Sequence, residues 1–517
     1  MRPPLWPALA AGVVAAVWID LSPSHHGHQA DSLVPVLASL QAWTPFYWGQ
    51  DRFGMLLPLL AMPFKHPFVN LLVQGGLSAF AGLAALFLLP RFVLPERGWL
   101  LVGLVSSWPF LAWAPEEFRF TVLSTGQPYQ LAAALGLAGL LLLDRPAHAR
   151  PSSGIVATAL GLLALAHWVN VASGLLLGPA LVARWLAAWA GRHQQATSGD
   201  ERHESRRGLP EIAPPTILAW LAVLGGFAAG LGLKWLVRAP STPTETRPLT
   251  EWLDGAGQLL QNAWSDLGPS PWPITAAFLA AAGLALLLVP SIRLGSAPSL
   301  WAALVLVGGA LLGAVAMGAS DWVEDNLFAT RYLSFSLLLL QTALAIPAGR
   351  ALAVALPRQR AAWLRAGTTG GLFLAVALGY DAPSLTEVRA VLDDRMGHRT
   401  ADILAARCTH IAGNYWRVWP MVFHANLVLY ERGERRTIWG VALRGGPTQR
   451  IWRRMPRAAI RIAVVPGDAD ADPYLQRSGL TNLVVVAKSD AIWVLRPAET
   501  VEPGEAIEPY PVRAVGP

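Results

Sequence analysis

The chain has 517 residues, of which 54% are hydrophobic and 14% are charged, whereas soluble globular proteins carry about 25% charged residues. Its mean hydropathy is +0.41 and its net charge is +7. This composition excludes a disordered chain, a basic nucleic-acid-binding protein and an ordinary cytosolic enzyme, and it indicates a polytopic membrane protein. The single cysteine, Cys408, excludes a disulfide framework and a multi-cysteine metal site.

Long apolar runs recur along the first 380 residues. A membrane-spanning helix needs about 20 largely apolar residues. Eleven runs are predicted to be such helices: 4–20, 68–90, 98–114, 128–143, 154–169, 171–190, 216–236, 273–290, 300–318, 332–348 and 365–380. The fifth and sixth runs meet at Asn170 and are together too long for one span, so a tight turn is expected there. The first run is followed by Asp20 and not by a small-residue cleavage site, which excludes a secretory signal.

The distribution of charge predicts the orientation of these spans. With the N-terminus inside and strict alternation, the inner segments hold 15 basic and six acidic residues, whereas the outer loops before residue 381 hold seven and 12. This agrees with the enrichment of Lys and Arg in cytoplasmic loops. The prediction therefore places the N-terminus in the cytoplasm and the tail, 381–517, outside.

Two further outer segments and one inner linker, 191–215, are expected. The first outer loop, 20–67, contains two predicted short helices, 31–42 and 53–63, lying along the membrane interface. The outer loop 237–272 is predicted to form an amphipathic interfacial helix. Its apolar residues at helical spacing are Trp252, Leu253, Leu259, Leu260 and Trp264.

The tail is predicted to be a soluble extracytoplasmic α/β domain, so the chain divides into 1–380 and 381–517. Residues 384–407 have a helical pattern. Three short β-rich runs bounded by turn residues, 437–443, 459–465 and 482–487, are predicted strands of a small open sheet. Residues 429–436 are interpreted as a turn. Asp468, Asp470 and Asp472 lack the glycine and glutamate of a calcium loop and are interpreted as a solvated turn.

Carboxylates recur in the predicted outer loops, close to apolar segments where ionisable groups are costly and usually functional. The first loop carries Asp31, and the loop after the third run carries Glu116 and Glu117. Arg331 and Tyr332 open the tenth run, at headgroup depth, where a guanidinium can hold a phosphate. The alternative for each acid is a solvated loop residue, and for Arg331 it is snorkelling or an ion pair with Asp325. The secondary candidates are Asp20, Asp51, Arg52, Asp321 and Asp325.

Together these features resemble the GT-C glycosyltransferases, polytopic membrane enzymes that take a sugar from a polyprenyl-phosphate-linked donor. The resemblance covers the topology of residues 1–380 and is closest to the bacterial protein mannosyltransferases and arabinose transferases. It implies that Asp31 is the general base, that Glu116 or Glu117 holds metal or acceptor, and that Arg331 with Tyr332 binds the donor phosphate. The family often has two adjacent acids in the first loop, whereas here Ser32 follows Asp31. Asp20 and Asp51 therefore stay open as alternatives for the catalytic acid.

One histidine cluster, His25, His26 and His28, lies beside Asp31. Imidazole and carboxylate groups suit zinc or manganese, and the cofactor that the resemblance allows is a divalent metal such as Mg, Mn or Zn. Adjacent histidines rarely ligate one ion, so the alternative is a polar loop without metal.

Two other functions are open from the sequence. A lipid or solute transporter or flippase would carry internal repeats and midplane charges, neither of which is evident. A non-catalytic scaffold would use the tail as a binding module. The acceptor (protein, lipid or polysaccharide) is not assigned. The Arg-rich, Lys-poor composition and the lack of organelle targeting favour a bacterial inner membrane.

Overall fold

The structure, a computed structural model, describes residues 6–25, 29–50, 52–94, 98–115, 119, 128–144, 152–197, 217–237, 245–268, 297–355 and 361–510. Within them, ten of the eleven predicted apolar runs are helical, and the run 273–290 lies outside them. The helices of this bundle are α1 (Trp6–Asp20), α4 (Pro67–Val93), α5 (Trp99–Trp108) continued by the π-turn η2 (Pro109–Trp113), α7 (Tyr129–Leu143), α8 (Ser153–Val169), α9 (Gly174–Thr197), α11 (Ile217–Val237), α15 (Ala297–Gly318), α17 (Ser334–Ala355) and α18 (Ala361–Gly379).

Five helical segments in the described part of the chain are long and apolar enough to cross a membrane. They are Pro67–Val93, Val171–Gly191, Ile217–Val237, Ser299–Gly318 and Thr330–Gly349. The other predicted runs are shorter apolar helices there. The chain is therefore a mainly helical, multi-pass membrane protein, as predicted, and the number of eleven spans stays a prediction.

Small residues allow close packing between neighbouring helices of the bundle. Gly226 and Gly230 of α11 are four residues apart, and a Cβ at either would meet the backbone of Leu163 or His167 in α8 at 3.0–3.2 Å. This is the small-residue spacing by which membrane helices approach one another. The opposite face of α11 leaves Leu221 and Leu224 59% and 63% exposed, as expected of residues that face lipid. The predicted turn is present, because Asn170 ends α8 and its side chain accepts a hydrogen bond from Ala172 N.

The first loop folds into two short helices, as predicted, α2 (Ala30–Leu40) and α3 (Leu56–Ala61). A buried amide of α4 ties them to the bundle. Asn70 donates through Nδ2 to Ser39 Oγ at 2.7 Å and to the carbonyl oxygens of Ala61 and Phe64 at 2.9 Å. These bonds fix the position of α2, which carries Asp31.

The C-terminal region contains a six-stranded mixed sheet in the order β2-β1-β3-β5-β4-β6. Its strands are β1 (His410–Ala412), β2 (Trp439–Val441), β3 (Ile462–Val464), β4 (Leu483–Lys488), β5 (Trp493–Pro497) and β6 (Glu508–Tyr510). Its helices are α19 (Leu385–Met396), α20 (Thr400–Ala405), α21 (Tyr415–Glu431), α22 (Gly446–Trp452) and α23 (Ala471–Arg477). Short 3-10 turns are η1 (Pro23–His25), η3 (Val171–Ser173), η4 (Leu249–Glu251), η5 (Thr330–Leu333), η7 (Gly397–Arg399), η8 (Arg457–Ala459) and η9 (Ala498–Thr500). The predicted helical segment and all three predicted strands are present.

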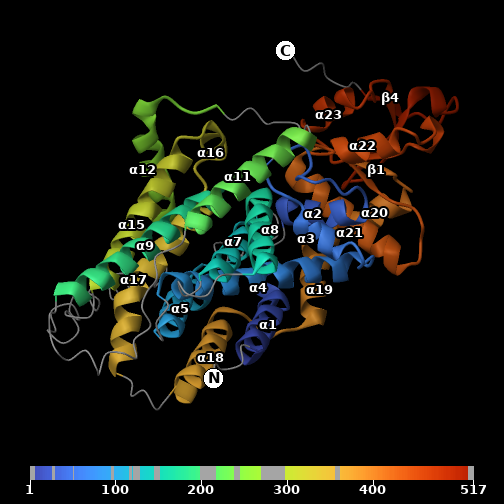
Figure 1. Cartoon of the computed structure of the whole chain (residues 1–517). Helices are drawn as coiled ribbons and strands as arrows, with labels where there is room; N and C mark the ends of the chain where they lie inside the picture. Colours follow the sequence, from blue (N-terminus) through green and yellow to red (C-terminus); the bar gives the residue numbers. More distant parts are fainter. Residues whose placement is uncertain are drawn as a thin grey trace.

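The C-terminal region and the first loop share one hydrophobic core. Leu33 and Leu37 of α2 pack with Val422 and Phe423 of α21. Trp48 meets Trp419 edge to face, with ring centroids 5.4 Å apart. Figure 1 shows α2 and α3 beside α21 and α20. The division at residue 381 stays a prediction, but the contact means that the C-terminal region helps to position the first loop.

The amphipathic helix is present as α12 (Trp252–Leu267). Leu259 and small residues such as Ala256 and Ala263 are buried where α12 packs on α15, whereas Leu253 and Trp264 are 72% and 65% exposed. Its place in the membrane interface stays a prediction. One local prediction needs correction. The turn predicted over 429–436 begins later, since α21 continues to Glu431 before the turn.

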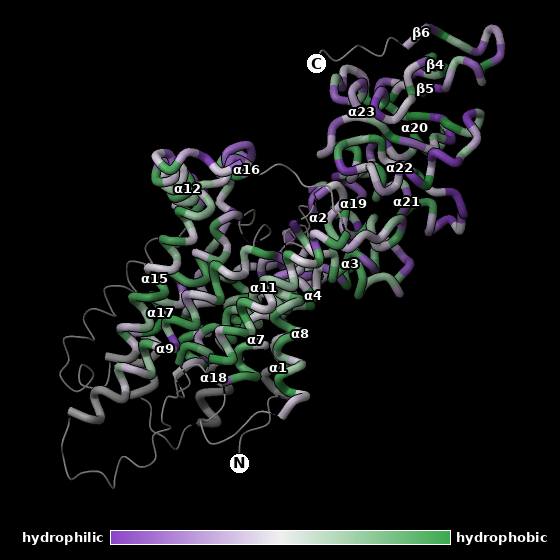
Figure 2. The backbone as a smooth tube through the Cα atoms, turned by 45° about the horizontal axis from the view of Figure 1, so that its top comes forward, coloured by the Kyte–Doolittle hydropathy of each residue, from purple (hydrophilic) through white to green (hydrophobic). Residues whose placement is uncertain are grey.

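Figures 1 and 2 show how the helices are arranged and where hydrophilic and hydrophobic residues lie. Helix α12 and the short α16 (Asp321–Asp325) lie at the same end of the bundle as the C-terminal region, and α1 and α18 extend to the other end (Figure 1). Figure 2 shows hydrophobic residues concentrated in the bundle and hydrophilic ones in the C-terminal region and around α16.

Candidate active site

Asp31 lies in the first turn of α2, where a hydroxyl group holds its carboxylate. Tyr415 donates to Asp31 Oδ1 at 2.5 Å. The Tyr415 oxygen is 2.8 Å from the hydroxyl of Tyr47. Because the carboxylate only accepts, Tyr415 gives its single proton to Asp31, and Tyr47 then donates to Tyr415. The result is a chain of two phenols that orients the carboxylate.

The position of Tyr415 follows from the start of α21. Asn414 caps this helix, and its side chain accepts a hydrogen bond from Trp416 N at 2.9 Å. Tyr415 is therefore the first helical residue and faces the first loop. Burial raises the pKa of Tyr415 and Tyr47 well above that of a free phenol, and the negative charge of Asp31 raises it further. Both hydroxyls therefore keep their protons.

Arg331 lies at the start of the tenth run, in the turn η5 that leads into α17. Its Nη2 donates to Asn326 Oδ1 at 3.2 Å, and its guanidinium lies 5.4 Å from the ring centre of Tyr332. Arg331 Nε is buried and has no hydrogen-bond partner among the described residues. No ion pair between Arg331 and Asp325 is present, although both side chains are described; Asp325 is exposed.

The structure brings Asp31 and Arg331 to one site. The charge of Asp31 acts on Arg331, and both charges act on the buried phenol of Tyr129, at the start of α7. Tyr129 packs edge to face on Phe53 and Phe335, at 6.1 and 5.3 Å. The general acid–base candidate and the phosphate candidate predicted from the sequence therefore lie within range of each other's charge.

Two more arginines lie at this site. Arg52, a secondary candidate, places its guanidinium carbon 3.8 Å from the ring centre of Trp322, and its charge acts on Tyr129. Arg444, from the turn after β2, lies 5.8 Å from the same ring, and its charge acts on Tyr47. Sequence reasoning missed Arg444, Tyr415 and Tyr129. Nothing in the local pattern of Arg444 distinguishes it from the other arginines of the tail, and only the shared core brings it here.

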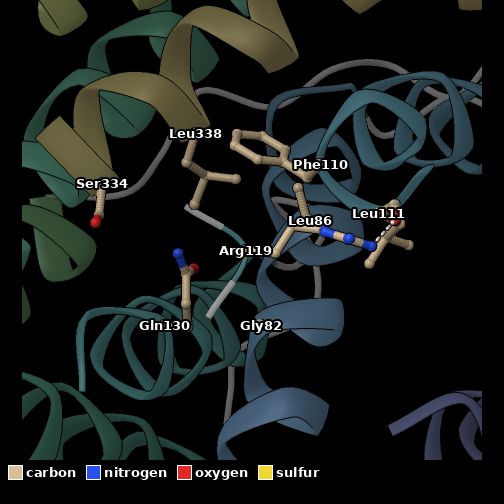
Figure 3. A pocket seen from close by; sticks show the side chains of 8 residues that line it. All are labelled: Gly82, Leu86, Phe110, Leu111, Arg119, Gln130, Ser334 and Leu338. Atoms are coloured by element: carbon tan, nitrogen blue, oxygen red, sulfur yellow. Dashed lines mark hydrogen bonds between the residues drawn. The ribbon is translucent and has the colours of Figure 1, made fainter. Parts of the chain in front are cut away.

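Two cavities adjoin these residues. One is lined by apolar side chains and by Arg119, Gln130 and Ser334. Figure 3 shows Gln130 and Ser334 on one side of it and Arg119 on the other, where Arg119 Nη1 donates to Leu111 O at 3.3 Å. The other is lined by Tyr47 and Phe53 among others.

The remaining predicted site residues lie elsewhere or outside the described residues. Asp20, at the end of α1, packs against Gly75 of α4, where a Cβ would collide with its carboxylate. His25 is buried edge-on to Tyr380, with ring centroids 6.1 Å apart. Asp321 and Asp325 open and close the short α16. Glu116, Glu117, Asp51, His26 and His28 lie outside the described residues.

Within the described ranges, no group of three or more His, Cys, Asp or Glu side chains is placed to hold a metal ion. The neighbours of Asp31 include two phenols and a guanidinium group. Divalent cations prefer carboxylate, carbonyl and imidazole ligands, and the other candidate ligands, Glu116, Glu117, Asp51, His26 and His28, lie outside the described residues.

Comparison with solved structures finds two that match along nearly the whole chain. One is ArnT from Cupriavidus metallidurans in the apo state, with 12% identity, a TM-score of 0.36, and 96% of this chain and 98% of that chain covered. The other is the archaeal oligosaccharyltransferase AglB from Archaeoglobus fulgidus, in complex with an inhibitory peptide and a dolichol-phosphate, with 12% identity, a TM-score of 0.35, and coverage of 98% and 76%. No protein-family model and no curated protein matches the chain.

Proposed function

We propose that this chain is a membrane glycosyltransferase that takes a sugar from a polyprenyl-phosphate-linked donor. One observation carries the proposal: a carboxylate oriented by a tyrosine hydroxyl, Asp31, acts electrostatically on a guanidinium whose Nε is buried and unpartnered in the described part of the chain, Arg331. Glycosyl transfer from a lipid phosphate needs these two groups, a base for the acceptor and a cation for the leaving group.

The proposed reaction uses each group once. Asp31 accepts the proton of an acceptor hydroxyl while the acceptor oxygen bonds to the anomeric carbon. The bond from that carbon to the phosphate oxygen breaks, and its electron pair leaves with the polyprenyl phosphate. Arg331 balances the charge on the departing phosphate, and its free Nε supplies a donor for it. Tyr415 and Tyr47 keep the carboxylate oriented for the acceptor.

The topology predicted from charge completes the proposal. Eleven spans, with the N-terminus in the cytoplasm, would place Asp31, Arg331 and a C-terminal extracytoplasmic α/β domain at the outer face of a bacterial inner membrane. The common end occupied by α12, α16 and the C-terminal region supports this arrangement (Figure 1). The acceptor stays open between protein, lipid and polysaccharide.

The test compares Asp31→Asn and Arg331→Ala with matched controls. Asp394→Asn and Arg450→Ala remove the same charges from exposed positions of the C-terminal region. Membranes with equal amounts of each variant receive polyprenyl phosphate carrying radiolabelled sugars, and release of polyprenyl phosphate and labelling of acceptor fractions are measured. We expect losses of at least about 100-fold for both site variants, as for removal of a charge-stabilising group, and none for the controls.

Wild-type rates in both site variants would refute the assignment. A flippase would give a different result: passage of fluorescent polyprenyl phosphate across liposomes by the wild-type protein, unchanged in Asp31→Asn, without transfer of sugar.

A further inference from the structure

Two arginines from opposite parts of the sequence meet at one aromatic ring beside Arg331. Arg52 comes from the first loop and Arg444 from the C-terminal region, and both guanidinium groups lie against Trp322 of α16. Asn326, which accepts from Arg331, donates through Nδ2 to Trp322 O at 2.7 Å. The three arginines are thus joined through Trp322 and Asn326.

The backbone holds Arg444 in a costly conformation. Its φ is 77°, in the left-handed region that residues other than glycine rarely occupy. The turn is fixed by Trp419 Nε1, which donates to Leu443 O at 3.0 Å, and by Arg444 Nη1, which donates to Gly49 O at 2.8 Å. Such conformations cost about 1–3 kcal/mol and gather at functional sites.

The loop that carries Trp322 and Asn326 also contains residues in the left-handed backbone region. Leu327 and Phe328 follow in succession with φ of 56° and 49°. Phe328 N donates back to Val323 O at 2.8 Å, which closes the loop around α16. Both segments that bring Arg444 and Trp322 together are therefore held in unusual backbone conformations.

The guanidinium of Arg444 also has hydrogen-bond donors without a partner among the described residues. Within the described residues its one hydrogen bond is through Nη1 to Gly49, which leaves Nε and Nη2 available, and the side chain is half-buried. The edge of a guanidinium can bind a phosphate through two parallel N–H groups. Among the described residues Arg444 forms no ion pair with a carboxylate of α16, and Glu324 of that helix pairs with Arg247 at 3.0 Å.

We propose that Arg444 and Arg52, which both lie beside the Trp322 ring, bind a second phosphoryl group beside the one held by Arg331. This inference rests on the proposed function and narrows its substrate class. The second phosphoryl group has two sources: the outer phosphate of a lipid-linked diphosphate donor, or a phosphate ester on the acceptor. In either case the C-terminal region supplies a binding residue of the transferase site.

The experiment measures binding to the purified full-length protein in lipid nanodiscs. In the first arm, undecaprenyl phosphate and undecaprenyl diphosphate are titrated. The wild-type protein is expected to bind the diphosphate about tenfold more tightly, one charge-assisted hydrogen-bonded pair being sufficient for that ratio. Arg444→Ala is expected to bring the ratio to about one, with binding of the monophosphate retained.

In the second arm, inorganic phosphate is titrated into protein saturated with undecaprenyl phosphate. Binding to the wild-type protein that is lost in Arg444→Ala, with an unchanged ratio in the first arm, assigns the second phosphoryl group to the acceptor. Arg450→Ala, on α22 of the same region, is the control in both arms. Arg444→Lys keeps the charge but not the paired N–H geometry and should give an intermediate loss.

Arg444→Ala with wild-type behaviour in both arms would overturn the inference, as would an equal loss for all ligands with a lower melting temperature of the free protein. The second result would make Arg444 a structural tie to Gly49. If Arg444→Ala does not fold, an unchanged ligand preference in Arg444→Lys and in Arg52→Lys would overturn the inference as well. Binding of the monophosphate that still depends on Arg331 would leave the proposed transferase intact in each case.

Discussion

The hydroxyl of Tyr415 is the group that orients the Asp31 carboxylate. Tyr415→Phe removes this donor while keeping the ring, which also packs on Trp416 at 4.9 Å. Because hydrogen bonds to charged groups contribute about 1.5–3 kcal/mol, we expect sugar transfer to fall about tenfold or more. Donor binding, which depends on Arg331, should stay unchanged.

The same substitution has a defined pH behaviour. Burial and Asp31 raise the pKa of Tyr415, so its hydroxyl stays protonated at every pH at which the protein is assayed. The ratio of wild-type to Tyr415→Phe activity should therefore be constant from about pH 6 to about pH 9, below the usual phenol pKa of about 10. A ratio that changes over this range would show that Tyr415 itself gains or loses a proton in the reaction.

His410 makes stability depend on pH. Burial lowers its pKa to about 3, and its Nε2 has no hydrogen-bond partner in the described residues, where its ring lies edge-on to Trp452. The unfolded chain, with a histidine pKa of about 6.5, binds a proton that the folded chain excludes. Stability is therefore complete above about pH 6.5 and falls as the pH decreases, by about 2 kcal/mol at about pH 5.

Unfolding in denaturant at the two pH values measures this difference. His410→Gln should remove about 2 kcal/mol of the difference, and the comparison at about pH 7 gives its separate effect on packing. An unchanged pH dependence would mean that another group is responsible.

At the scale of elements, α4 positions the first loop through Asn70. Asn70→Ala removes the bonds to Ser39, Ala61 and Phe64 and the acceptor of Gln74 Nε2 at 2.8 Å. Because buried acceptors are left unpaired, we expect a loss of about 3 kcal/mol and faster hydrogen exchange of α2 amides. Asn70→Asp, which keeps the shape and the acceptor but not the donor, should lose most of the same stability. Wild-type exchange rates in α2 would show that its packing on α21 is sufficient.

The hydrophobic pattern of the sequence predicts most of the secondary structure. A long apolar run forms a helix because its backbone N–H and C=O groups must hydrogen-bond to one another away from water. Ten of the eleven predicted runs, α2, α3 and three strands agree with the prediction. Helix α21 was not predicted, although its hydrophobic face packs on α2, because its aromatic residues and Pro420 obscure the helical pattern.

For the candidate site, the sequence indicated the residues that are unusual where they stand. Asp31 and Arg331 are charged residues beside apolar runs. The free-energy cost of placing a charge there indicates a functional residue. Tyr415 and Arg444 are ordinary residues of a polar tail, and their place at the site depends on contacts with residues almost 400 positions earlier. A local sequence pattern cannot predict contacts between residues so far apart in the chain.

At the scale of the molecule, the C-terminal region and the first loop fold against each other. Trp48 and Trp419 are both fully buried and meet edge to face. Such pairs add about 0.5–1.5 kcal/mol beyond the burial of their area. A double-mutant cycle of Trp48→Ala and Trp419→Ala should therefore give a coupling of at least about 1 kcal/mol, and each single variant should reduce sugar transfer by displacing Asp31 from Tyr415. A coupling near zero would mean that the two parts fold independently.

The orientation of the whole chain can be tested with its single thiol. Cys408 is fully buried, and burial raises its pKa to about 12, so a maleimide should not label the wild-type protein. Glu387→Cys and Ser152→Cys place reactive thiols at exposed positions before α21 and at the start of α8, which the predicted topology assigns to opposite sides of the membrane. A membrane-impermeant maleimide added to intact spheroplasts should label Glu387→Cys and should label Ser152→Cys only after permeabilisation. The reverse pattern would place Asp31 and Arg331 in the cytoplasm, where the donor would have to present its sugar on the inner leaflet, and would contradict the orientation derived from the arginines.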